Sequence, residues 1–229
     1  MTLVTYVPHR RPAPAHNANF MVLDPFTRRN LELTETIRSR KVEGSLLGIL
    51  DRTTTAMGAR LLRTWISQPL LEISRLNARL DAVEALTADE ALRVELREAL
   101  KRIADIERLT NRQLVWRAGP RDLLGLRASL ELIPHIQSLI EPLPPLRPLA
   151  ERMDACADIS DAIARALTDD PPAAMNVIGT IRPGYAEELD AILDATREAR
   201  EWIANLESQE RRRTGIASIK VGFNKVFGY

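Results

Sequence analysis

The feature that most constrains the fold of this chain is a narrow apolar seam near its C-terminal end. Small and apolar residues recur there at spacings of 4, 3, 4, 3, 4 and 3: Tyr185, Leu189, Ile192, Thr196, Ala199, Ile203 and Leu206. This alternation is typical of a coiled-coil seam rather than of a broad core-facing surface. It predicts a helix from Tyr185 to about Arg212, which would extend roughly 40 Å at 1.5 Å per residue.

The polar faces of this helix can be stabilised in water without a covering domain. Arg197 with Glu201, and Glu207 with Arg211, are four residues apart and can form ion pairs along the helix. We therefore expect the helix to project from the body of the protein instead of lying flat on it. On periodicity alone, an ordinary bundle helix remains an open alternative.

The rest of the chain is also patterned for helices. Apolar residues make up 45% of the sequence and aromatic residues only 4%, which favours helices packed by aliphatic contacts and disfavours an all-β fold. Stripes at helical spacing predict helices over residues 55–68, 73–86, 92–114, 121–140 and 149–167. The predicted fold class is therefore mainly α, with a helical bundle as the core.

Local signals indicate where several of these segments begin and end. Thr55 can cap the helix predicted over residues 55–68. Gly119 followed by Pro120 is the order expected where one helix ends and the next begins. Pro134 should kink or loosen the helix that contains it. The short apolar run over residues 20–24 has the length of a strand or a buried extended segment.

The pattern changes near the C-terminal end. After Gly215, the residues Ile219, Val221 and Phe223 alternate with polar or small ones, which indicates a strand. A lone strand is not stable, so this strand should pair with residues beyond Tyr229 or with another molecule. We therefore expect this chain to be truncated, and we expect residues 1–19 to be a linker.

The charge is unevenly distributed in the same part of the chain. The net charge is +1, yet residues 205–229 carry five basic residues against two acids, while residues 186–204 carry six acids against two arginines. The basic residues are Arg211, Arg212, Arg213, Lys220 and Lys225, and they suit phosphate oxygens of a nucleic acid. A plain alternative is that arginines at a helix C-terminus complement the helix dipole.

Several kinds of chemistry lack their usual residues in this sequence. No glycine-rich phosphate-binding motif is present, the three histidines are far apart, and the single cysteine, Cys156, has no neighbouring ligand type. We expect no catalytic residue, no metal site and no cofactor in this chain. No apolar run approaches the roughly 20 residues that span a bilayer, so a cytoplasmic protein is expected.

Motifs distributed in order along the chain resemble the MutS family of DNA mismatch-repair proteins. The resemblance covers about residues 20–229 and rests on these segments: MVLDPFTRRNLEL at 21–33, MGARLLR at 57–63, DIER at 105–108, GPRDL at 119–123, GYAEELD at 184–190, RTGI at 213–216 and KVGFNKVFGY at 220–229. Any one of them could arise by chance, but the ordered set is highly specific.

The resemblance implies a particular domain organisation. Residues 1–19 would be a linker or the end of a preceding connector domain, residues 20–184 the first part of the helical core or lever domain, and residues 185–229 the clamp arm helix with the first strand of a short β clamp. The clamp of this family contacts the DNA backbone without reading bases. The positions that match its contact loop are Asn224 and Lys225, and Lys220 precedes them as a further candidate.

The resemblance also implies what the complete protein would do. The parent would be an ATPase that uses ATP and Mg, forms a homodimer with a MutS partner subunit, binds double-stranded DNA and a MutL-type repair factor, and couples DNA binding to ATP hydrolysis. This chain alone would not be an enzyme. A second hypothesis, from a different class, is a stand-alone helical scaffold that binds a protein through the seam of residues 185–206.

Overall fold

The computed structural model describes residues 19–174, 176–218 and 220. The described part is mainly helical and contains no strand, only two isolated β-bridges. By chain contacts it divides into two compact units, Met1–Ile163 and Ala164–Tyr229. The helices of the first unit are α1 (Pro25–Asn30), α2 (Leu46–Leu50), α3 (Ala56–Ser67), α4 (Ile73–Ala88), α5 (Glu90–Lys101), α6 (Ile106–Leu114), α7 (Pro120–Leu130), α8 (Ile133–Ile140) and α9 (Arg147–Ala150). The division falls inside α10 (Ala157–Ala166), and the second unit contains α11 (Glu187–Thr214).

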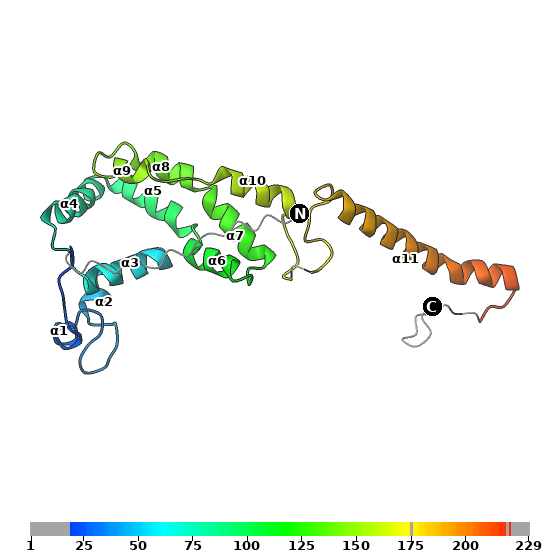
Figure 1. Ribbon diagram of the computed structural model, residues 1–229, viewed down its shortest axis with the longest axis horizontal. Helices are drawn as coiled ribbons and strands as arrows, with labels where there is room; N and C mark the ends of the chain where they lie inside the picture. Colours follow the sequence, from blue (N-terminus) through cyan, green and yellow to red (C-terminus); the bar gives the residue numbers. More distant parts are fainter. Residues whose placement is uncertain (1–18, 175, 219, 221–229) are drawn as a thin grey trace. The chain divides into compact units, whose positions relative to one another are not determined.

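The first unit is a helical bundle with a small core. Helix α5 packs against α4 and α8, α6 pairs with α7, and α2 packs against α3 (Figure 1). The buried apolar side chains of this unit come from most of these helices and their connections: Leu47, Leu70, Ala99, Leu130, Ile136, Ile140, Ala150 and Ile163. Leu130, Ile136 and Ile163 lie in predicted apolar stripes, whereas the stripe over residues 73–86 is largely exposed, with Ile73 71% and Leu80 64% exposed.

Buried hydroxyl groups join neighbouring segments inside this bundle. Ser129 is 1% exposed, donates to the carbonyl of Gly125 at 2.7 Å and accepts from the N–H of Ala104 at 3.0 Å. Ser45 caps α2 by accepting from the N–H of Gly48. Because a buried polar group without a partner is costly, these bonds allow serine to occupy interior positions.

The predicted helix starts are confirmed where capping residues are present. Thr55 caps α3 by accepting from the N–H of Gly58 at 3.0 Å. Gly119 is the N-cap of α7 and Pro120 its first residue, while the Asp122 carboxylate accepts from the Gly119 N–H at 2.8 Å. A proline suits the first turn because its missing N–H would have no partner inside the helix.

Three predicted helices are each divided in the structure. The segment over residues 149–167 forms α9 and α10, and the other two are divided within a continuous apolar stripe. The stripe over residues 92–114 forms α5 and α6, because Asp105 accepts from the N–H of Arg108 and starts a new helix. The stripe over residues 121–140 forms α7 and α8, with Pro134 in the first turn of α8. In both cases the apolar spacing continues across the break, so periodicity alone does not reveal it.

The expectation of a strand or buried extended segment over residues 20–24 is wrong. Phe20 forms only an isolated antiparallel bridge with Leu70, supported by a bond from the N–H of Met21 to the carbonyl of Pro69 at 2.8 Å. Val22 is 79% exposed. No further chain pairs with this segment among the described residues, so it remains an extended connection that leads to Asp24, the N-cap of α1.

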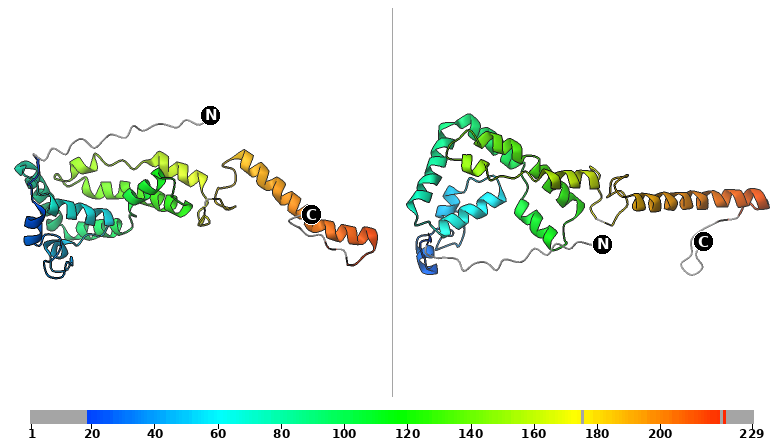
Figure 2. Two further views of the ribbon diagram at one scale, coloured as in Figure 1. Left: turned by 60° about the horizontal axis from the view of Figure 1, so that its bottom comes forward. Right: turned by 45° about the horizontal axis from the view of Figure 1, so that its top comes forward.

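The second unit contains the long helix predicted from the apolar seam. Helix α11 has 28 residues and is continuous in both views of Figure 2. None of its residues is buried: Leu189, Thr196 and Ile203 are half-buried, and Ile192 is 62% exposed. The helix is therefore confirmed, whereas its projection from the body of the protein stays a prediction.

The segment before α11 is fixed by one arginine. The Nε of Arg182 donates to the carbonyls of Ala164 and Leu167, at 3.2 and 3.1 Å, and its guanidinium forms an ion pair with Asp169 at 2.9 Å. Carbonyl groups at the end of a helix lack partners within the helix, so this arginine stabilises the C-terminal end of α10.

Candidate nucleic-acid interface

The predicted interface begins at the C-terminal end of α11. The helix ends at Thr214 because Gly215 follows with φ of 73°, a left-handed conformation that glycine adopts without a Cβ penalty. The Gly215 N–H donates to the carbonyl of Arg211 at 3.0 Å. The last turn contains three consecutive arginines, so several cationic side chains lie where the negative end of the helix dipole favours them.

Two of these three arginines are paired with acids on the same helix. Arg211 forms an ion pair with Glu207, four residues earlier. Arg213 donates to Glu210 through both Nε and Nη2, with the Nη2 to Oε2 distance 2.7 Å. The basic cluster that the sequence predicts is therefore partly neutralised by its own helix.

The hydrogen bonds between Arg213 and Glu210 change the acidity of both groups. The side-chain hydrogen bond from Arg213 holds the pKa of Glu210 below its usual value. The same contact raises the pKa of Arg213. Both groups are therefore ionised at neutral pH, and the positive charge of Arg213 is offset at that point of the surface.

Arg212 is the arginine of this turn that is left for an external partner. Its side chain is exposed, and no ion pair or hydrogen bond joins it to another described residue. Lys220, also exposed, follows eight residues later. Together they supply the uncompensated positive charge at this end of the described chain.

The other two predicted contact residues cannot be placed beside Lys220. Asn224 and Lys225 lie outside the described residues, as does most of the strand expected around Ile219, Val221 and Phe223. Their role in contacting a nucleic acid stays a prediction from the resemblance.

A different cluster of charges, which no pattern in the sequence predicts, joins two helices. Arg60 in α3 donates to Asp105 at 2.7 Å and to Glu107 at 2.6 Å, across 45 and 47 residues of chain. Each of these residues belongs to a segment quoted above for the family resemblance, but no local pattern indicates that they pair. Contacts over such a distance would need covariation between related sequences to be found.

The described residues offer no site for metal or thiol chemistry. They contain no group of three or more His, Cys, Asp or Glu side chains that could hold a metal ion. Desolvation raises the pKa of the Cys156 thiol, and the carboxylates of Asp154 and Asp158 add to that effect. A raised pKa lowers the thiolate fraction at neutral pH, so this cysteine is poorly suited to act as a nucleophile.

The described part of the chain also contains no membrane-spanning helix. None of its helices is both long and apolar enough to cross a bilayer. The longest of them, α11, carries charged side chains along its whole length.

The sequence profile of MutS domain III matches residues 26–213. The chain is 53% identical over 224 residues to the DNA mismatch repair protein MutS of Brevibacillus brevis, which covers 96% of this chain and 26% of that protein. It is 49% identical over 211 residues to MutS of Alkaliphilus oremlandii (91% of the chain and 24% of the relative) and 45% identical over 211 residues to MutS of Bacillus subtilis (91% and 25%). The chain thus spans about a quarter of the length of these relatives.

Proposed function

This chain belongs to the MutS family, in which it matches domain III, and from that membership we propose that it is the core and clamp-arm segment of a DNA mismatch-repair ATPase. The observation that carries the proposal is the match to domain III over residues 26–213, which includes almost all of α11 and ends at its basic last turn. In this role the chain performs no chemistry. It holds a DNA-contacting surface and transmits the displacement of that surface to the rest of the protein.

The form of α11 supports the role of an arm. It is 28 residues long and uninterrupted, so it extends roughly 40 Å at 1.5 Å per residue. Its first turn carries three acids and its last turn three arginines, an order that complements the helix dipole at both ends. A helix stabilised in this way is stiff enough to move as one body, which is what a mechanical connection between distant sites requires.

The contact with DNA is proposed to be non-specific and electrostatic. Arg212 and Lys220 present positive charge that no described acid neutralises, and Asn224 and Lys225 would extend this surface to the contact loop. Charged contacts to phosphates position a protein on a duplex without reading its sequence. We therefore expect weak, salt-dependent binding by this chain alone, without preference for a mismatch.

We extend the proposal to the complete protein, as membership of the family implies. The parent would bind ATP and Mg in a domain outside this chain, pair with a second MutS subunit and engage a MutL-type repair factor. Double-stranded DNA would be the shared ligand of the clamp and the mismatch-reading domain. This chain would connect the binding of DNA to the binding and hydrolysis of ATP in that other domain.

Fluorescence anisotropy with a labelled homoduplex and a matched G·T-mismatch duplex tests the proposal. The full 229-residue chain is titrated over a range of salt concentrations, alongside the variants Arg212→Gln, Lys220→Gln and Lys225→Gln. Each variant should weaken binding to both duplexes equally and lower the salt slope by about one, as expected for one lost phosphate contact. Arg102→Gln is the matched control, because Arg102 is exposed and follows α5 in the first unit.

Two results would contradict the proposed DNA contact. One is tight binding with a preference for the mismatched duplex, which a backbone contact cannot provide. The other is an equal effect of Arg102→Gln and the three interface variants, which would show that only the overall charge of the chain matters.

A further inference from the structure

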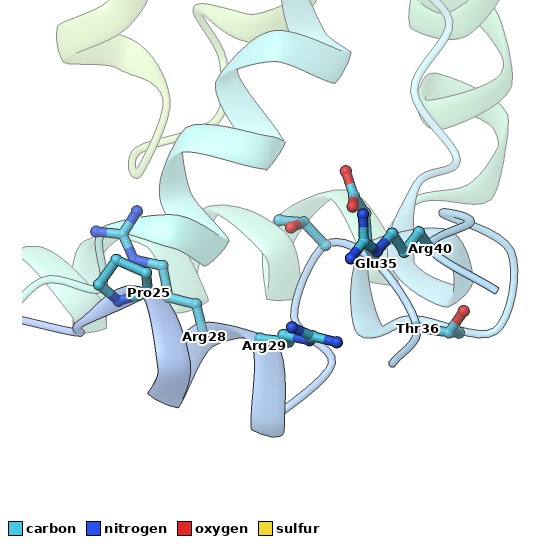
Figure 3. A pocket seen from close by; sticks show the side chains of 7 residues that line it. Pro25, Arg28, Arg29, Glu35, Thr36 and Arg40 are labelled. Carbon is cyan, nitrogen blue, oxygen red and sulfur yellow. The ribbon is translucent and has the colours of Figure 1, made fainter. Parts of the chain in front are cut away.

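A second cationic site lies in the first unit, far along the chain from the arm. A cavity of about 400 Å³ is formed by α1 and the loop over residues 34–40 that follows it. Figure 3 shows Arg29 from α1 near Arg40 and Glu35 from the loop, whereas the guanidinium of Arg28 lies over Pro25 and points away from them. Two guanidinium groups thus share this side of the cavity with a single carboxylate.

The loop side of the cavity is held in place by the backbone. The N–H of Arg40 donates to the carbonyl of Thr36 at 3.0 Å, and the N–H of Thr36 donates to the carbonyl of Lys41 at 2.9 Å. The Glu32 carboxylate accepts from the N–H of Ile37 at 2.6 Å. These bonds close the loop, so the residues that face the cavity are positioned before any ligand arrives.

Arg40 is held in an uncommon backbone conformation. Its φ of 51° lies in the left-handed region, which residues other than glycine adopt only with backbone strain. Backbone strain of this kind concentrates where a side chain must be presented to a ligand. In this loop, the strained residue is one of the arginines that line the cavity.

The charges in the cavity are not satisfied by the protein. Arg28 donates through its Nε to the carbonyl of Leu23 at 3.0 Å, and its guanidinium points away from Arg29 and Arg40. Arg29 and Arg40 form no ion pair or hydrogen bond through their side chains with any described residue. The Thr34 hydroxyl can donate to an oxyanion, whereas the Thr36 hydroxyl is hydrogen-bonded to the Ser39 hydroxyl at 2.6 Å.

We propose that this cavity binds a phosphate group. Guanidinium groups match the geometry of phosphate oxygens and donate to them in pairs, and a bound anion would neutralise the positive charge of Arg29 and Arg40. The phosphate can come from a DNA backbone or from a free phosphate compound, and the chemistry of recognition is the same for both. The site is separate from the DNA contact proposed for the arm and does not depend on it.

Thermal unfolding of the full chain in inorganic phosphate tests this assignment. Phosphate replaces chloride at constant ionic strength and pH 7, so that general screening does not change. A ligand that binds only the folded state raises the unfolding temperature in a saturable way. We expect this saturable rise for phosphate, and we expect Arg29→Gln and Arg40→Gln each to weaken the apparent Kd by about tenfold, the loss expected for one charge-assisted hydrogen bond of about 1.5 kcal/mol.

Two further variants distinguish the site from general charge and from folding defects. Arg38→Gln is the matched control, because Arg38 is an exposed arginine of the same loop that does not line the cavity. It should leave the phosphate Kd unchanged. Glu35→Gln removes the one carboxylate of the cavity and should tighten phosphate binding, a gain that a damaged fold cannot produce.

The source of the phosphate is identified by competition. If a short DNA duplex displaces inorganic phosphate from the wild-type chain but not from Arg40→Gln, the site takes a backbone phosphate; if only ATP or pyrophosphate does so, it takes a free one. The proposal is overturned if phosphate gives no saturable stabilisation. It is also overturned if Arg38→Gln weakens binding as much as Arg40→Gln, or if Glu35→Gln fails to tighten it.

Discussion

The guanidinium of Arg60 in α3 donates to the carboxylate of Asp105 at 2.7 Å, although 45 residues separate them in the chain. Asp105 is also the N-cap of α6, where it accepts from the N–H of Arg108 at 3.1 Å. One carboxylate therefore starts a helix and ties it to another. Arg60 binds Glu107 in the same turn, which makes the link between the two helices resistant to the loss of one contact.

The first prediction concerns the pH dependence of this link. The side-chain hydrogen bond from Arg60, with smaller contributions from Arg108, lowers the pKa of Asp105 from 3.8 to about 2. A carboxyl with a lower pKa in the folded state stabilises the protein at a pH above its unfolded pKa, and this stabilisation is lost as the pH falls toward the folded value. Stability should therefore decline between about pH 4 and pH 2 in part because Asp105 becomes protonated.

Urea unfolding between pH 5 and pH 2 measures this contribution. Asp105→Asn keeps a side-chain oxygen for the cap but removes the titrating group, so its stability should depend less steeply on pH than that of the wild type. Asp81→Asn serves as the control for an exposed carboxylate of α4. Equal pH slopes for the Asp105→Asn variant and the wild type would disprove the role assigned to this carboxylate.

The second prediction concerns the small core of the first unit. Ile140 at the end of α8 is 4% exposed, and Ile73 at the start of α4 is 71% exposed. Ile140→Ala should lower the free energy of unfolding by about 2–5 kcal/mol, because it removes buried methyl groups and leaves a cavity. Ile73→Ala should cost much less. Chemical denaturation measures the stability of both variants. A similar loss of stability in the two would contradict the assigned core.

The third prediction concerns a strained residue after α6. Trp116 has φ of 56° and is 89% exposed. Its backbone is therefore in the left-handed region, and burial of the side chain does not compensate for the strain. Trp116→Gly should be more stable than Trp116→Ala by about 1 kcal/mol, because only glycine relieves the strain. Thermal or urea denaturation of the two variants measures the difference, and equal stability would show that this turn carries no strain.

The fourth prediction concerns the arm in the parent protein. Ala195 is an exposed residue inside α11, where proline would remove a backbone hydrogen bond and bend or break the helix. If α11 transmits DNA engagement, Ala195→Pro in the parent should abolish most of the stimulation of ATP hydrolysis by DNA while leaving the basal rate intact. Ala195→Ser keeps the helix and is the control. Normal stimulation in the proline variant would rule out α11 as the transmitter.

The amino-acid sequence by itself determined most of the helices. The seam over residues 185–206 led to α11, Thr55 marked the start of α3, and Gly119 with Pro120 marked the start of α7. These features depend on side chains within one or two turns of each other, which are adjacent in the sequence whatever the rest of the chain does. The ordered family motifs had the same local character.

Only the tertiary structure decided which helices are tied together and which charges remain unpaired. The link from Arg60 to Asp105 and the gathering of Arg29 and Arg40 around one cavity both depend on how the chain folds in three dimensions. Beyond the one or two helical turns around it, a charged residue has no preferred partner in the sequence, because many opposite charges lie within reach of a flexible chain. Tertiary packing brings one partner within reach of a charged side chain. Other charged side chains stay unpaired and can bind a ligand.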